Sequence, residues 1–237
     1  GAVPGVQLAH AGRKGSSAQP WLGGQQLTDA EGGWGTIGPT DQPFDDDGTR
    51  LWKAPKKMQQ DDIGQIQDAF VAAAKRALKA GYEFLEIHCA HGYLLHSFLS
   101  PLVNTRTDAY GGDLKCRARM LLETTEKVRA AWPQGLPLAV RLSITDWVEG
   151  GLTVEDNIQV ATWLKALGVD LVDCSSGGAT PAARGSINGG IAQQVGMAAD
   201  LRQGSGLMSM AVGEITQAQQ AEGIIASGQA DIVLLAR

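Results

Sequence analysis

Apolar and polar residues along the chain follow two periods. Short apolar runs of the length typical of buried strands occupy residues 6–9, 82–87, 138–144, 169–175, 208–212 and 231–235. The segments between them carry apolar residues at helical spacing over residues 61–81, 117–131, 153–167, 191–202 and 216–227. Strands that alternate with helices form a parallel sheet with right-handed crossovers. The pattern therefore predicts an α/β fold with six strands, which is either a barrel or an open sheet.

Local signals refine two parts of this pattern. Thr153 with Asp156, and Thr216 with Gln219, have the spacing of a capping box at the start of a helix. Residues 16–60 form a long excursion rich in Gly, Pro, Asp and Trp. Connections of this length inside a compact domain are commonly functional. We therefore expect the excursion to act as a lid or a substrate-facing loop.

Two histidines and a tyrosine follow the second predicted strand. The apolar run that ends at Ile87 leads into His88, His91 and Tyr93, with Gly92 freeing the backbone to turn. In α/β proteins, ligands bind at the carboxyl ends of parallel strands. Two imidazole N–H groups that converge on one oxygen would bind a carbonyl and favour negative charge developing on it. Tyr93 adds a phenolic proton donor.

Two other interpretations of the histidine pair stay open. One is a zinc site, although the chain has only four histidines and no third ligand at a motif spacing. The other is a pair of core histidines satisfied by backbone carbonyls. Local sequence alone does not choose between a functional pair and a structural one.

Other predicted strands also carry polar or small residues near their ends. Arg141 interrupts an apolar run, and a buried guanidinium needs an anion or an acceptor. The alternative is an internal salt bridge with Asp or Glu. Gly213 and Arg237 follow the last two predicted strands, where barrels often bind phosphate. The alternative for Arg237 is a simple surface charge.

Composition narrows the class of protein. The chain contains no run of about 18 apolar residues, so no membrane span is predicted. A net charge of −5 argues against nucleic acid as a main partner. Three scattered cysteines indicate reduced thiols in a cytoplasmic protein rather than a disulfide framework. Because the chain begins without Met and stops directly after a strand, we expect it to be cut at both ends.

Several stretches together resemble the old yellow enzyme family of NADH:flavin oxidoreductases. Within that family the resemblance is to the bacterial xenobiotic reductases, or thermophilic-like ene-reductases. The resemblance runs through the whole chain in order, and residues 98–112 carry its most specific part. The matching stretches are residues 5–14, 88–94, 98–101, 104–112, 212–213 and 234–237.

The resemblance implies a (β/α)8 TIM barrel that binds FMN. Residues 1–237 would form a single FMN-binding domain, shortened to about six βα units because the first two strands and the C-terminal tail of the family are absent. On the family pattern, Gln7 bonds the pyrimidine edge of the flavin, and Arg141 lies near N1 and the C2 carbonyl. The positions that match the phosphate site are Gly213, Ala236 and Arg237.

The resemblance also assigns the substrate site and an activity. His88 and His91 match the pair that grips the substrate carbonyl, Tyr93 the proton donor, and Lys14 a basic residue beside the flavin. The implied reaction passes a hydride from NADPH or NADH to FMN. Flavin N5 then delivers it to the β-carbon of an α,β-unsaturated carbonyl held by the histidine pair, and Tyr93 protonates the α-carbon.

The expected partners are small activated alkenes such as enones, maleimides and nitroalkenes. No nucleic acid, membrane or resident metal is expected, and a homo-oligomer stays open. Two alternatives remain for the function. One is a barrel fragment without cofactor or activity, and the other is an FMN barrel of the dienoyl-CoA reductase type.

Overall fold

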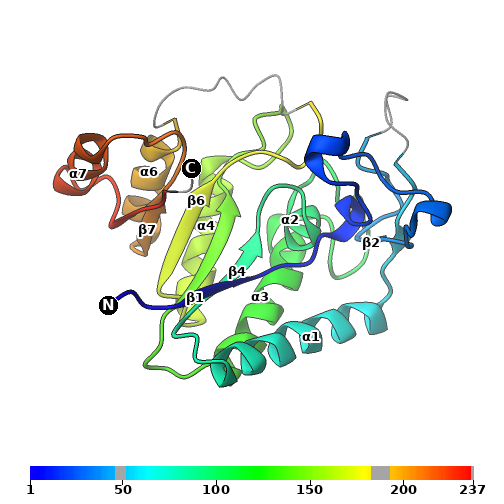
Figure 1. Cartoon of the computed structure of the whole chain (residues 1–237), viewed down its shortest axis with the longest axis horizontal. Helices are drawn as coiled ribbons and strands as arrows, with labels where there is room; N and C mark the ends of the chain where they lie inside the picture. The colour runs from blue at the N-terminus through cyan, green and yellow to red at the C-terminus, as the bar shows by residue number, and fades with distance from the viewer. Residues whose placement is uncertain (46–51, 183–192, 236–237) are drawn as a thin grey trace.

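Six parallel strands form one curled sheet in the computed structural model, which describes residues 1–45, 52–182 and 193–235. The strand order is β1-β4-β5-β6-β7-β8, so each strand pairs with the next one along the chain, as expected from the alternating pattern. The sheet is a half-barrel rather than a flat layer (Figure 1). Its strands are β1 (Gly5–Leu8), β4 (Phe84–Cys89), β5 (Leu138–Ser143), β6 (Leu171–Ser175), β7 (Met208–Ala211) and β8 (Ile232–Val233).

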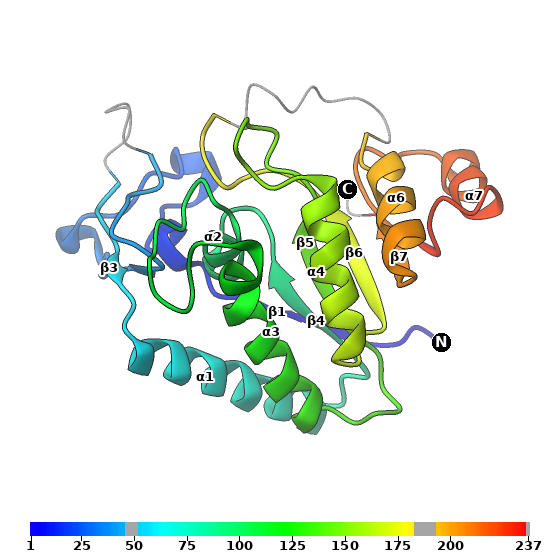
Figure 2. The same ribbon diagram turned by 180° about the vertical axis from the view of Figure 1, so that it is seen from behind.

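The helices cover the convex face of the sheet. Helices α3 and α4 lie behind the strands in Figure 1 and in front of them in Figure 2, and α1 runs below the strands in both views. Helix α1 packs on α3, α3 on α4, and α4 on α6. The helices are α1 (Gln60–Lys79), α2 (Leu94–Leu99), α3 (Leu114–Ala131), α4 (Val154–Ala166), α6 (Val195–Ser205) and α7 (Ala218–Ala226).

Alternation along the strands separates an apolar outer face from a polar inner face. Leu85 and Ile87 point outward into the main core, whereas Glu86 and His88 point into the barrel lumen. Leu85 is paired with Leu138, and Ile87 with Val140, so the outward residues of neighbouring strands form continuous apolar rows under the helices. This core holds the sheet and fixes the register that places the lumen residues.

The cap predictions had mixed outcomes. The Thr153–Asp156 capping box at the start of α4 is confirmed. The second prediction was wrong by one residue, because the box at the start of α7 is formed by Gln217 and Gln220. Gln217 supplies the same kind of side-chain acceptor as a Thr cap, and sequence alone did not distinguish the two neighbouring positions.

The excursion after β1 is an ordered layer rather than a featureless loop. Its described part contains two 3₁₀ turns, Pro20–Leu22 and Asp29–Glu31, and two short paired strands, β2 (Ile37–Gly38) and β3 (Lys56–Lys57). Buried Arg106 ties this layer to the chain after α2, because its Nη1 donates to the carbonyls of Pro39 and Met58 at 2.8 Å each. Over the described residues, no helix has both the length and the apolar content needed to cross a lipid bilayer.

Candidate functional site

A row of polar side chains crosses the lumen on four adjacent strands. Gln7 on β1 donates from Nε2 to Glu86 Oε1 on β4 at 2.5 Å. Arg141 on β5 lies beside Asp173 on β6, with 3.1 Å between Arg141 Nε and Asp173 Oδ2. The four side chains line one hollow of about 450 Å³ in the lumen, together with apolar residues that include Phe84. The register therefore brings together Gln7 and Arg141, the two residues that the family resemblance assigned to one ligand.

Burial dominates the electrostatics of this row. The pKa of Asp173 is raised to about 7, first by burial and then by the negative charge of Glu86, while Arg141 opposes the shift. The pKa of Glu86 is also raised by burial, against the hydrogen bond from Gln7 and the charge of Arg141. Two carboxylates thus compete for one guanidinium in a poorly hydrated space.

Arg141 is held by a protein anion, which was the alternative interpretation of its position. Its contact with Asp173 is an ion pair that lacks hydrogen-bond geometry, so Arg141 Nε and Asp173 Oδ1 have no hydrogen-bond partner among the described residues. The Arg141 side chain retains 24% of its surface exposure, toward the lumen hollow. An internal ion pair and a ligand-facing guanidinium are therefore compatible here.

The histidine pair and the tyrosine lie at the carboxyl end of β4, where His88 is paired with Arg141 of this row. The ring centroids of His88 and His91 are 5.3 Å apart, and the Tyr93 ring is also 5.3 Å from His88. His91 Nε2 lies 2.7 Å from Ser175 Oγ on β6. His88 is only 4% exposed, and its Nδ1 has no hydrogen-bond partner within the described part of the chain. The rings are thus not core histidines satisfied by backbone carbonyls.

Both imidazoles are neutral near pH 7. Burial lowers the pKa of His88 to about 4 and that of His91 to about 3, and the positive charge of Arg141 adds to both shifts. A neutral imidazole carries one N–H donor and one acceptor nitrogen. The pair can therefore donate to a substrate oxygen without bringing a formal charge into the site.

A tight turn sets the position of His91. His91 itself has φ 58°, and Gly92 follows with φ 72°. A Cβ on Gly92 would overlap the carbonyl of Gly178 in the loop after β6, so only glycine fits this close approach. Ser143 Oγ accepts from the His91 N–H at 2.9 Å and donates to the carbonyl of Gly177 at 2.8 Å. The ends of β4, β5 and β6 are thereby joined around the histidine.

Lys14 contacts the histidine turn from the excursion side. Its Nζ donates to the His91 carbonyl at 2.8 Å and lies over the rings of Phe44 and Tyr93, 4.5 and 5.1 Å from their centroids. A second hollow, of about 400 Å³, opens here and is lined by Lys14, Phe44, Trp52 and Tyr93 among others. The basic residue predicted beside the site thus lies next to Tyr93.

The predicted phosphate positions are only partly covered by the structure. Gly213 follows β7 with φ 111°, and a Cβ there would meet Gln194 Oε1 at 3.1 Å, at the start of α6. Ala236 and Arg237 lie outside the described residues. The structure therefore places Gly213 at a helix start and leaves the other two positions as predictions.

Sequence reasoning missed several residues that complete the site. Glu86 and Asp173 interrupt apolar strands just as Arg141 does, so the same signal was present at both positions. Ser143 and Ser175 carried no such signal, because serine is common at strand ends. Their roles depend on register, which places Ser143 opposite Ser175.

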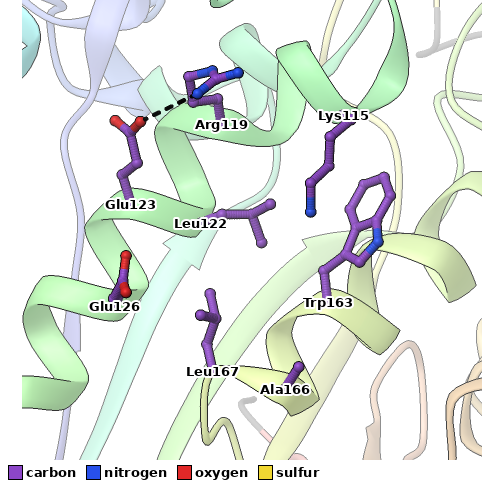
Figure 3. Close-up of a pocket in the computed structure, with 8 residues that line it drawn as sticks. All are labelled: Lys115, Arg119, Leu122, Glu123, Glu126, Trp163, Ala166 and Leu167. Atoms are coloured by element: carbon purple, nitrogen blue, oxygen red, sulfur yellow. Dashed lines mark ion pairs between the residues drawn. The ribbon is translucent and has the colours of Figure 1, made fainter.

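A groove on the outer surface is the main competitor for the candidate site. It measures about 290 Å³ and lies between α3 and α4, lined by Lys115, Arg119, Leu122 and Trp163 among others (Figure 3). Arg119 pairs there with Glu123 at 3.8 Å, and Lys115 covers the Trp163 ring at 4.0 Å. Among the described residues, none of the buried side-chain atoms that lack a hydrogen-bond partner belongs to a residue lining this groove, in contrast to the lumen.

No three His, Cys, Asp or Glu side chains come together as a possible metal site in the part of the chain that the structure describes. The histidine pair therefore has no third ligand of these types within that part.

Comparison with known proteins places the chain among flavin oxidoreductases. The profile of the NADH:flavin oxidoreductase / NADH oxidase family matches residues 1–237. An NADPH dehydrogenase of Halalkalibacterium halodurans is 40% identical over 237 residues, which is all of this chain and 63% of that protein. An NADH:flavin oxidoreductase of Gibberella zeae is 40% identical over 239 residues, covering 94% of this chain and 57% of that protein. The chain thus spans about three fifths of the length of these relatives.

Solved structures agree with this placement. The old yellow enzyme homologue of Zymomonas mobilis superimposes with a TM-score of 0.74 at 25% identity, over 98% of this chain and 62% of that one. A 2-naphthoyl-CoA reductase, solved with 2-naphthoyl-CoA, superimposes with a TM-score of 0.80 at 26% identity, over 98% of this chain and 35% of that one. The expected barrel, represented here by six of its strands, is confirmed. By profile, relatives and fold, the chain belongs to the NADH:flavin oxidoreductase / NADH oxidase family and is of the old yellow enzyme type.

Proposed function

We propose that this protein is an FMN-dependent ene-reductase that uses NADPH or NADH to reduce activated carbon–carbon double bonds. The observation that carries the proposal is the pair of neutral, buried imidazoles beside Tyr93, with His88 paired in the sheet to Arg141 of the lumen row. The family and the printed names of the relatives support a flavin and a nicotinamide reductant. The substrate class is inferred from the side chains.

The lumen residues fit a flavin ring. Arg141 Nε and His88 Nδ1 are buried polar atoms without hydrogen-bond partners among the described residues, and buried polar groups rarely stay unpaired. Gln7 and Arg141 present an amide and a guanidinium to the same hollow, which suits the oxygen and nitrogen atoms on the pyrimidine edge of FMN. Gly213, Ala236 and Arg237 would hold the phosphate. Bound FMN would supply the hydride that it takes from NAD(P)H.

The chain's own residues then bind and polarise the alkene. His88 and His91 donate N–H groups to the carbonyl or nitro oxygen, and they favour the negative charge that builds on that oxygen. Tyr93, 5.3 Å from His88 between ring centroids, delivers a proton to the α-carbon. Lys14 holds the His91 carbonyl and thereby helps to fix the turn that carries the histidine pair. Enones, maleimides and nitroalkenes all meet these requirements.

The test has two readouts. The protein is loaded with FMN, freed of excess cofactor, and its visible spectrum is recorded; NADPH oxidation is then followed without and with cyclohexenone or N-phenylmaleimide. We expect a flavin band and alkene-dependent NADPH oxidation. Arg141→Met should weaken FMN binding, whereas Arg119→Met, in the outer groove, should not. A colourless protein would favour the inactive-fragment alternative, and a yellow protein inert toward every alkene would overturn the substrate class.

A second substrate class has one specific support. The solved 2-naphthoyl-CoA reductase is a structural neighbour, so an unsaturated acyl-CoA remains the alternative to a free enone. The same assay with 2-naphthoyl-CoA and with a dienoyl-CoA separates the two. Turnover only with the thioesters would replace the enone by the acyl-CoA.

A further inference from the structure

A fourth histidine lies buried behind the proposed substrate site. His96 on α2 and Asp146 in the loop after β5 are both fully buried, and 3.1 Å separates His96 Nε2 from Asp146 Oδ1. The other ring nitrogen, Nδ1, accepts the N–H of Gly92 at 2.8 Å. His96 therefore connects the turn between His91 and Tyr93 to a carboxylate on the neighbouring strand's loop.

The hydrogen bonds define which nitrogen of His96 carries the proton. Because Nδ1 accepts from a backbone N–H, the proton of the neutral ring must lie on Nε2, facing Asp146. The contact with Asp146 is close, although it departs from ideal hydrogen-bond geometry. Asp146 Oδ2 is occupied by Ser100 Oγ at 2.7 Å and by the N–H of Leu152 at 2.9 Å, which leaves Oδ1 for the histidine.

Gly92 is held at both of its backbone polar groups, one in each of the two peptide units that flank its Cα. Its N–H is held by His96, and its carbonyl accepts from Ser97 Oγ at 2.9 Å. Both partners are on α2, the short helix that begins directly after Tyr93. A rotation of either peptide unit about the Gly92 Cα would change the direction of His91 relative to that of Tyr93.

We propose that His96, oriented by Asp146, is a positioning residue that fixes the His91–Gly92 peptide and thereby the relative placement of His91 and Tyr93. His96 touches neither ring, so it acts through the backbone. Its effect on catalysis rests on the proposed ene-reductase function, but its effect on the turn does not. The two effects are therefore measured separately.

Two substitutions divide the roles of the imidazole. His96→Asn places an amide oxygen where Nδ1 was and keeps an acceptor for Gly92, whereas His96→Gln places its amide where Nε2 was and keeps a donor for Asp146. We expect the Gln variant to exchange the Gly92 amide hydrogen roughly tenfold faster, the change expected for one lost hydrogen bond. It should also lower kcat for cyclohexenone by about 100-fold, as a small misplacement of catalytic groups does, with a smaller change in KM. The Asn variant should retain more of both properties.

The role of the Asp146 carboxylate is tested by locating the proton on the His96 ring. In Asp146→Asn the N–H of Leu152 still requires an oxygen, so the amide NH₂ must face His96 Nε2 and drive the ring proton to Nδ1, against the Gly92 N–H. ¹⁵N NMR of the full chain should place the proton on Nε2 in the wild type and on Nδ1 in this variant. The Gly92 amide should again exchange faster.

Each outcome bears on one of the two claims. If the Gln variant preserves slow Gly92 exchange better than the Asn variant, His96 serves the Asp146 contact alone and the positioning role is wrong. A wild-type proton on Nδ1 would also overturn it. If exchange and NMR behave as expected but no variant, including the wild type, reduces an alkene, the positioning role stands and the proposed function fails.

Discussion

The two faces of the same strands differ in how completely their side chains are satisfied. Leu85 and Ile87 on the outer face of β4 are fully buried against the helices and make only apolar contacts. On the inner face, Glu86 and His88 are almost as buried, yet His88 Nδ1 lacks a hydrogen bond among the described residues. A buried polar group without a hydrogen bond lowers the free energy of unfolding. The apolar packing of the outer face must therefore compensate for the unsatisfied groups of the inner face. One face holds the fold, and the other is prepared for a ligand.

The largest expected effect is on the outer face. Ile87→Ala should lower the free energy of unfolding by about 2–5 kcal/mol, because it opens a cavity where the helices cannot collapse onto the strand. Chemical denaturation followed by circular dichroism measures the change. Ile225→Ala on α7, where the side chain is 41% exposed, is the matched control and should cost much less. Equal losses at the two sites would remove the contrast between core and surface.

On the inner face, function should respond more than stability. Tyr93→Phe should raise the barrier to enone reduction by ~2.7–4 kcal/mol, the cost typical of losing one donor to a reacting group. Stopped-flow measurement separates flavin reduction by NADPH from flavin oxidation by cyclohexenone. Only the second step should slow in this variant, and Tyr82→Phe, at the opposite end of β4, should slow neither. Equal slowing of both steps would contradict the proton-donor role.

Asp173 should give the inner face a distinctive pH dependence. Its pKa in the folded state is about 7, against about 3.9 for an unfolded aspartate, so the folded protein holds one more proton between these values. The stability it contributes is fully present below pH ~4 and is lost as the pH rises toward 7, by about 1.4 kcal/mol per pH unit.

The same pH window contains an opposing contribution from the histidines. The pKa values of His88 and His91 are lowered, so stability linked to them is lost as the pH falls below about 6.5. Comparing the wild type with Asp173→Asn isolates the aspartate. The difference in unfolding free energy should change with pH between 4 and 7 and level off above 7. A difference independent of pH would mean that Asp173 is ionised throughout.

The smallest expected effect lies on neither face. Gly64 is in α1, and a Cβ there would meet nothing within 4 Å. Gly64→Ala should therefore raise the free energy of unfolding by about 0.5–1 kcal/mol through helix propensity alone. Thermal denaturation detects such a shift, and alkene reduction should be unchanged. A loss of stability would show that α1 makes contacts at this position that the structure lacks.

The sequence was sufficient to predict the strands and the polar residues near their ends, but not which residues of neighbouring strands are paired. Apolar periodicity predicted the six strands, and a charged residue inside an apolar run was enough to mark Arg141. Its partner Asp173 was not foreseen, because pairing across strands depends on register, and register is set by packing of the whole sheet. Residues 100–112 were expected to form a loop, and they contain no helix. The short helix α2 just before them was not predicted. Six residues are too few for helical periodicity to be recognised.

The meeting of Gly92 with Gly178 constrains how this site can diversify. At that point two main chains from different crossovers touch without room for any side chain on either residue. This contact leaves no space at the point of approach. An insertion or deletion in either loop can therefore be accommodated only away from Gly92 and Gly178. The layer formed by the excursion after β1 lies away from this contact, and Phe44 and Trp52 border the second hollow there, so residues lining that hollow can vary while the approach of Gly92 to Gly178 is kept.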